Sequence, residues 1–266
     1  INNDGLADVI EVDMAPQDNL RKKMFQAPVN YQMYQNSDQF GYQYQYTRNM
    51  LQLNLGPTVG EQDTITHPVF ADAGYLAGIS ETDWSWTPLV ADFDNDGNKD
   101  IMFTNGFPKD ITDRDFITFR SLAYQMTSEK DMLSEIPEVK IHNYIYRNNG
   151  SLHFVDKTYD WGFEAPTFSS GAAFADLDND GDLDIVINNI SDPAGVYENK
   201  VNDGEKEKTH FVTIKFKGSE KNINGIGDTI NVFQKEVQEA LNFYEAHRAE
   251  IDAFIQAEAA LEPTDE

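Results

Sequence analysis

The chain has 266 residues and a formal net charge of -26. This acidity argues against binding to nucleic acid or to anionic lipid, because both require a basic surface. The sequence has no cysteine, which excludes disulfides, thiolate metal sites and a cysteine nucleophile. It also has no apolar stretch long enough to span a membrane.

The first element is a short acidic segment, residues 2–8. It is an incomplete copy of a nine-residue pattern that occurs twice in full further along the chain. The complete copies are Asp92–Asp100 (DFDNDGNKD) and Asp176–Asp184 (DLDNDGDLD). We call these segments loop 1, loop 2 and loop 3 in chain order. In the pattern D-x-D-x-D-G-x-x-D, oxygens from positions 1, 3, 5, 7 and 9 converge, and such an oxygen set suits calcium. The glycine allows a sharp turn, and the carboxylates would repel one another without a cation.

The pattern therefore predicts one calcium ion for each complete loop. The alternative is a set of acidic surface turns without metal, which three copies in one register make less favourable. An EF-hand is excluded, because position 12 is Phe103 or Ile187 instead of glutamate. The predicted ligands are Asp92, Asp94, Asp96, Asn98 (carbonyl) and Asp100 in loop 2, Asp176, Asp178, Asp180, Asp182 (carbonyl) and Asp184 in loop 3, and Asn2, Asp4, Leu6 (carbonyl) and Asp8 in loop 1. Loop 1 lacks its first ligand, so we expect it to bind calcium weakly or not at all.

Predicted strands follow the loops, and two inserts separate the repeats. Residues 101–104 and 185–188 are β-rich and too short for helices. The inserts lie at about residues 17–48 and 109–142, and without them the repeat has about the length of a four-stranded propeller blade. We expect the second insert to be helical over residues 110–135 and the first to be partly helical and partly extended. The aromatic residues of the first insert either form a glycan- or protein-binding surface or pack the insert onto the sheets.

The repeat resembles the FG-GAP/VCBS blades of integrin-like β-propellers. Residues 89–105 (LVADFDNDGNKDIMFTN) and 171–189 (GAAFADLDNDGDLDIVINN) carry this resemblance. More narrowly, residues 48–54 and 82–86 are similar to segments of large VCBS-repeat proteins of Bacteroidetes. The resemblance implies a mainly β fold, a partial β-propeller over residues 1–205, with helical inserts and calcium in the blade loops. It also implies an exported or surface-exposed protein that acts in adhesion or recognition.

The chain after the propeller has a different character. Residues 206–232 resemble the start of an ASPIC/UnbV-like domain, and residues 233–266 are expected to form an amphipathic helix with an acidic tail. No signal peptide is visible. Because the chain opens inside a motif, we expect it to be a fragment of a longer protein.

No catalytic residue and no binding site for an organic cofactor are predicted. Metalloprotease, nucleophile-elbow, Walker and dinucleotide patterns are absent, and the carboxylates crowd within single loops, whereas a glycosidase places them across a sugar. We therefore expect a calcium-binding recognition, adhesion or scaffold module at an extracellular, periplasmic or outer-membrane location, with a protein or glycan partner that the sequence does not identify. The alternative is a carbohydrate-active or glycan-binding protein that uses the propeller face around Tyr42, Tyr44, Trp84 and Trp86.

Overall fold

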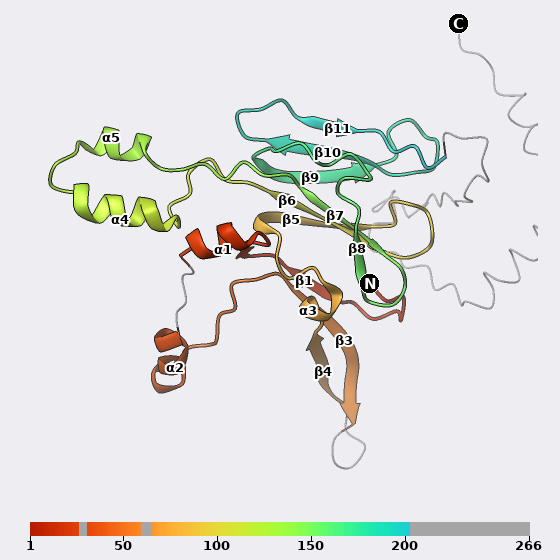
Figure 1. The fold of residues 1–266 in the computed structure, drawn as a ribbon. Helices are drawn as coiled ribbons and strands as arrows, with labels where there is room; N and C mark the ends of the chain where they lie inside the picture. Colours follow the sequence, from red (N-terminus) through yellow and green to blue (C-terminus); the bar gives the residue numbers. More distant parts are fainter. Residues whose placement is uncertain (27–30, 60–64, 203–266) are drawn as a thin grey trace, which may run out of the picture. The chain divides into compact units, whose positions relative to one another are not determined.

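The computed structural model describes residues 1–26, 31–59 and 65–202 of the chain. Within these residues the fold is mainly β, with three antiparallel sheets and short helices, and it is consistent with the predicted partial β-propeller (Figure 1). The segments expected to be an ASPIC/UnbV-like domain (206–232) and a C-terminal helix (233–266) lie outside the described residues. No helix in the described part of the chain has both the length and the apolar character needed to cross a bilayer.

The central sheet has five strands in the order β2-β5-β6-β7-β8. They are β2 (Met14–Ala15), β5 (Asp83–Ala91), β6 (Asp100–Asn105), β7 (Tyr144–Asn148) and β8 (Phe154–Asp156). The last four pair in chain order as an antiparallel meander, which is the unit of a propeller blade. β2 comes from the preceding repeat and pairs with the start of β5, where Met14 lies opposite Trp84. This pairing joins two repeats in one sheet.

Two three-stranded sheets repeat parts of the same unit. One contains β1 (Val9–Glu11), β3 (Met50–Val59) and β4 (Ile65–Asp72), which follow loop 1 as β6, β7 and β8 follow loop 2. The other contains β9 (Ser169–Ala175), β10 (Asp184–Asn189) and β11 (Gly195–Tyr197), which are the counterparts of β5, β6 and β7. The strands predicted after loops 2 and 3 are thus β6 and β10. Both complete loops are the turns of equivalent hairpins.

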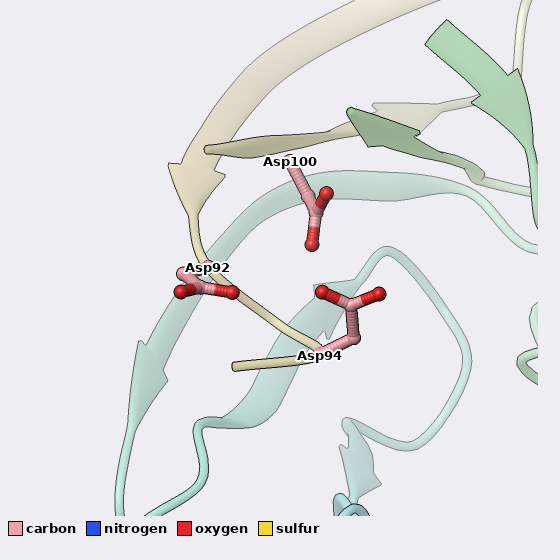
Figure 2. A group of neighbouring side chains, drawn as sticks. All are labelled: Asp92, Asp94 and Asp100. Carbon is pink, nitrogen blue, oxygen red and sulfur yellow. The ribbon is translucent and has the colours of Figure 1, made fainter. Parts of the chain in front are cut away.

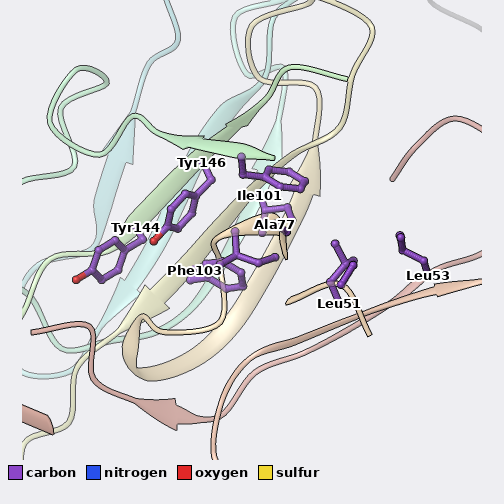
Figure 3. Close-up of a cluster of buried hydrophobic side chains, with 10 residues drawn as sticks. Leu51, Leu53, Ala77, Ile101, Phe103, Tyr144 and Tyr146 are labelled. Atoms are coloured by element: carbon purple, nitrogen blue, oxygen red, sulfur yellow. The ribbon is translucent and has the colours of Figure 1, made fainter. Parts of the chain in front are cut away.

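The core lies on both faces of the central sheet. Side chains alternate along a strand, so Ile101 and Phe103 of β6 point to one face and Met102 points to the other. Ile101 and Phe103 pack in a cluster with Leu51 of β3 and Tyr146 of β7 (Figure 3). Met102 packs with apolar side chains of β5 and β10. Because neighbouring sheets cover both faces of β6, the strand ends that carry the acidic loops are held firmly in place.

A chain of buried hydrogen bonds links neighbouring sheets at the end of β6 that is away from loop 2. The Asn105 N–H donates to Asn143 Oδ1 at 2.8 Å, and Asn105 Oδ1 accepts from Ser85 Oγ at 2.7 Å. Asn143 Nδ2 in turn donates to Ser169 Oγ at 2.9 Å, and Ser169 donates to Asn189 Oδ1 at 2.8 Å. Ser85 and Asn105 occupy the same repeat positions as Ser169 and Asn189. The chain satisfies buried polar groups in successive repeats and so fixes the alignment of the sheets.

The inserts form short helices around an ion-pair bridge. The first insert contains α1 (Asn19–Met24) and α2 (Tyr31–Phe40), and the second contains α4 (Arg114–Ala123) and α5 (Glu129–Ser134). A further short helix, α3 (Gly74–Ala77), lies outside the inserts, between β4 and β5. The helix expected over residues 110–135 is divided in two, because the Ser128 side chain caps a new helix. Arg21 of α1 pairs with Asp83 at 3.0 Å and with the buried Asp110 at 2.8 Å. This bridge holds both inserts near the start of β5.

The aromatic side chains of the first insert lie mostly at the surface. Tyr34 stacks on Tyr44 with ring centroids 4.6 Å apart, each side chain is 39% exposed, and Tyr42 is 72% exposed. Trp84, in contrast, is buried and stacks on Phe107 with ring centroids 4.7 Å apart. The exposed fractions therefore favour a surface role for the tyrosines and a packing role for Trp84.

Candidate metal centres

Loop 2 brings three of its carboxylates together at the turn between β5 and β6. One oxygen each of Asp92, Asp94 and Asp100 lies within 4.8 Å of the other two (Figure 2). The backbone N–H groups of Asp96 and Gly97 donate to Asp92 at 3.0 and 2.8 Å and fix its orientation. Calcium–oxygen bonds measure about 2.3–2.6 Å, so oxygens at this separation can share one calcium ion.

Loop 3 forms a similar cluster from a different set of positions. One oxygen each of Asp176, Asp178 and Asp180 lies within 4.8 Å of the others. Asp176 accepts the Gly181 N–H at 3.2 Å, as Asp92 accepts the equivalent glycine N–H in loop 2. Positions 5 and 9 distinguish the loops. Asp180 belongs to the cluster of loop 3 and Asp184 does not, whereas Asp100 belongs to the cluster of loop 2 and Asp96 does not.

The backbone of both loops turns through left-handed residues. Asn95 and Asn179 have φ angles of 54° and 63°, and Gly97 and Gly181 both have a φ angle of 90°. Asparagine and glycine are the residues that adopt this conformation most readily. The sequence Asn-Asp-Gly therefore shapes the turn before any ion binds.

The last carboxylate of each loop closes it from the first residue of the following strand. Asp100 is fully buried and accepts N–H groups from Asn148 at 2.8 Å and from position 2 of its own loop at 3.0 Å. Asp184 makes the same two contacts, with Asn199 at 2.8 Å and with position 2 of loop 3 at 2.9 Å. A carboxylate oxygen can accept more than one hydrogen bond, so Asp100 and Asp184 can make these bonds and still coordinate a metal ion.

Position 7 is occupied by Asn98 in loop 2 and Asp182 in loop 3. The Asn98 N–H and side-chain amide both donate to Asp96 Oδ1, at 2.8 and 3.0 Å. Asp182 is buried, and its Oδ2 accepts the Asn202 N–H at 3.1 Å. Both side chains are thus held by protein groups, and coordination through the two carbonyls stays a prediction.

Loop 1 is the poorest candidate for a metal. Among the described residues it offers only two carboxylates, Asp4 and Asp8. Asp4 accepts the Leu6 N–H at 2.8 Å and the Asn2 amide at 2.9 Å, and these hydrogen bonds lower the pKa of Asp4. Asp8 Oδ1 accepts the Asn54 N–H at 2.9 Å. The carboxylates of loop 1 are therefore already engaged with protein groups.

Several carboxylate oxygens in loops 2 and 3 are buried without any protein partner. They are Asp94 Oδ1, Asp176 Oδ1, Asp180 Oδ2 and Asp182 Oδ1. A buried charged oxygen without a partner is unfavourable, and native structures rarely retain one. A calcium ion at each cluster would supply the missing partner of Asp94, Asp176 and Asp180, so the donor set of both loops fits calcium.

The electrostatics of the metal-free loops agree with this fit. Burial, together with the charges of Asp94 and Asp96, raises the pKa of Asp100 to about 7. Burial and the neighbouring Asp180 raise the pKa of Asp182 to about 6. The pKa of Asp94 is also raised, mainly by burial and then by Asp96. A bound cation would reverse these shifts, because it favours the ionised carboxylates.

Two asparagines to which the sequence assigned no role tie each loop to its neighbour. Asn148 Nδ2 donates to the carbonyl at position 8 of loop 2 at 3.0 Å and to the carbonyl of Ile1, beside loop 1, at 3.1 Å. Asn199 Nδ2 makes the equivalent bonds to Leu183 at 3.3 Å and to Phe93 in loop 2 at 2.7 Å. The repeat alignment places both asparagines at matching positions, which is the signal that could have found them.

The acidic loops also bond to one another directly. Asn3 Nδ2 of loop 1 donates to the Gly97 carbonyl of loop 2 at 2.8 Å. Asn95 Nδ2 of loop 2 donates to the Gly181 carbonyl of loop 3 at 3.2 Å. Position 4 of one loop thus bonds to position 6 of the next, and the three loops form a connected row.

Arg147 of β7 is a further residue that sequence reasoning did not identify. Its Nη2 donates to Asp96 Oδ2 at 2.8 Å, and its Nε forms an ion pair with Asp94. The equivalent residue of the next repeat, between Tyr197 and Asn199, is Glu198. The two loops therefore share a backbone design but differ in the charge beside them.

One comparison with known proteins bears on this arrangement. Residues 134–187 match the family described as an FG-GAP-like repeat. The matched segment includes β7, β8, β9 and loop 3 and ends at Ile187 in β10. No curated protein matches the chain. The match supports the FG-GAP resemblance for this part of the chain and agrees with the partial β-propeller fold.

Proposed function

We propose that this chain, which contains an FG-GAP-like repeat, is a calcium-stabilised β-propeller module that acts in recognition or adhesion. The repeat itself supports a recognition or adhesion module of the propeller type. The observation that carries calcium is the set of buried, unpartnered carboxylate oxygens in loops 2 and 3. Calcium takes six to eight oxygen ligands, and carboxylates and carbonyls are the donors that these loops offer.

The proposed role of the ion is structural. Loops 2 and 3 are turns of equivalent hairpins, and hydrogen bonds from Asn95 and Asn199 connect one loop to the other. An ion that neutralises a loop would also fix the ends of two strands and the spacing to the next repeat. Binding to the folded state alone stabilises it by mass action. We propose no catalytic role for the module.

We place the module outside the cytoplasm, in an exported or cell-surface bacterial protein. Extracellular calcium sites have dissociation constants of about 10⁻⁴–10⁻³ M, so loops of modest affinity suit that environment. We also propose that the chain is of the type found in VCBS-repeat proteins of Bacteroidetes. Residues 206–232 would then begin an ASPIC/UnbV-like domain.

Thermal unfolding in excess EDTA, followed by titration with calcium and separately with magnesium, tests the calcium role. We expect a rise in melting temperature with calcium that magnesium does not reproduce, since magnesium requires a smaller, near-octahedral site. At a calcium concentration 100 times the dissociation constant, each site should add about 2.7 kcal/mol of stability. Asp178→Asn should reduce the rise, and Asp160→Asn, an exposed acid outside the loops, should not. Equal melting temperatures in EDTA and calcium would refute the proposal.

A second candidate function, glycan binding, is favoured by the exposed tyrosines of the first insert. Tyr34 and Tyr44 form a stacked pair at the surface, and Tyr31 and Phe40 are 73% and 63% exposed. Aromatic faces of this kind can pack against a sugar ring, while the hydroxyl and neighbouring amide groups donate hydrogen bonds. A glycan array probed with the wild-type chain and with Tyr44→Ala separates the two functions. Tyr124→Ala, which removes an exposed tyrosine of the second insert, is the matched control.

A further inference from the structure

The charge beside loop 2 is supplied by a residue of β7. Arg147 Nη2 donates to Asp96 Oδ2 at 2.8 Å, and Nε pairs with Asp94 Oδ2 without hydrogen-bond alignment. The arginine side chain is 40% exposed, so the pair lies at the edge of the loop. Arg147 thus engages two of the carboxylates that the sequence pattern assigns to calcium.

The equivalent position beside loop 3 carries the opposite charge. Asn148 and Asn199 make the same backbone bond to the last carboxylate of their loops, which fixes the register of β7 and β11. The residues just before them are Arg147 and Glu198. Glu198 pairs only loosely with Lys200, at 3.4 Å. Loop 3 itself has five carboxylates and no basic residue, whereas loop 2 has four carboxylates and one lysine.

The arginine also accounts for the difference at position 5. Both oxygens of Asp96 are engaged, Oδ1 by Asn98 and Oδ2 by Arg147, and Asp96 stands outside the oxygen cluster of loop 2. In loop 3 Asp180 Oδ2 is buried without a partner, and Asp180 belongs to the cluster. A guanidinium therefore occupies one candidate calcium ligand in loop 2, while the same ligand in loop 3 is available.

We propose that Arg147 is a tethered counter-ion that makes loop 2 a weaker calcium site than loop 3. This inference rests on the proposed calcium function and adds to it an order of filling. Calcium affinity rises with the number of charged ligands. At loop 2 calcium must displace the guanidinium from Asp96 or bind beside its positive charge, whereas Asp180 Oδ2 in loop 3 has no hydrogen-bond partner, so loop 3 fills first. In the absence of calcium the arginine neutralises part of loop 2.

Calorimetric titration of the full chain with calcium, after removal of metal by EDTA and dialysis, tests this order. We expect two classes of site in the wild type. Asp178→Asn should remove the tighter class, and Asp92→Asn should remove the weaker one. Arg147→Gln should tighten the weaker class by about two- to fivefold, the range expected for loss of a partly exposed ion pair, and leave the tighter class unchanged. Arg147→Lys should leave the calcium affinity of the weaker class close to its wild-type value, because lysine retains the positive charge.

The reciprocal change gives a test that does not depend on the folding of the Arg147 variants. Glu198→Arg places a positive charge beside loop 3 and should weaken the tighter class by about tenfold. Glu198→Gln is its control and should have a smaller effect. An unchanged weaker class in Arg147→Gln, or an unchanged tighter class in Glu198→Arg, would overturn the inference while leaving the calcium function intact. Absence of calcium binding in the wild type would overturn both.

Discussion

Loops 2 and 3 show how one repeat can keep its architecture and change its electrostatics. Their asparagine φ angles are 54° and 63°, their glycine φ angles are both 90°, and their last carboxylates accept equivalent N–H groups. The side chains beside them differ, with Arg147 at loop 2 and Glu198 at loop 3. Backbone geometry is thus set by residues within the repeat pattern, whereas the charge balance is set by positions that the pattern leaves free.

The largest expected effect concerns the pH dependence of the metal-free protein. The pKa of Asp100 is raised to about 7 by burial, against a usual value near 4. The folded state therefore holds a proton that the unfolded chain has lost, and stability should fall as the pH rises from about 4 to about 7. A shift of about three units corresponds to a loss of at most ~4 kcal/mol. Chemical denaturation in EDTA between pH 4 and 8 measures it.

The control for this prediction assigns the effect to one loop. Asp100→Asn should flatten the pH dependence, and saturating calcium should remove it in the wild type, because the ion stabilises the carboxylate. Asp182→Asn tests loop 3 in the same way, since the pKa of Asp182 is raised to about 6 by burial and by Asp180. A pH slope that persists in both variants would show that groups outside the loops cause it.

The next effect concerns the asparagines that tie neighbouring loops. Asn148→Ala removes side-chain bonds to two carbonyls in a site that is 1% exposed, and should cost about 2–3 kcal/mol of unfolding free energy. Asn199 is only half-buried, so Asn199→Ala should cost less, about 1–2 kcal/mol. Asn149→Ala, at the exposed neighbouring position, is the control. Urea denaturation in EDTA gives all three values, and equal costs for Asn148 and Asn149 would contradict the assignment.

The sequence predicted the local features of this molecule well. The motif D-x-D-x-D-G-x-x-D, the strands β6 and β10 and the mainly β repeat all depend on residues close together in the chain. It did not predict which oxygens of each loop converge. The difference at position 5 depends on Arg147, which lies 51 residues from Asp96 in the sequence. The bond from Asn148 to Ile1 spans 147 residues, and no local pattern encodes such a pairing. Aligned repeats identified the equivalent positions but could not assign their contacts.

The smallest expected effect tests whether the two calcium sites communicate. Asn95→Gly keeps the left-handed backbone, at a φ angle of 54°, and removes the bond to the Gly181 carbonyl of loop 3. We expect the free energy of unfolding of Asn95→Gly to be about 0.5–1 kcal/mol lower than that of Asn179→Gly, which makes the same change at the same position of loop 3. Calcium at loop 2 would hold the Asn95 amide in place, and calcium at loop 3 would hold the Gly181 carbonyl that this amide contacts. The bond should therefore make binding at one site favour binding at the other.

Calcium titrations of the two glycine variants measure this coupling. If calcium binding at loop 2 is coupled to binding at loop 3, the difference between the two apparent dissociation constants should change in Asn95→Gly. It should stay at the wild-type value in Asn179→Gly. Equal behaviour of the two variants would mean that each loop binds calcium independently. In that case the charge beside each loop would be enough to account for the order of filling, and the loop-to-loop bonds would serve only to align the sheets.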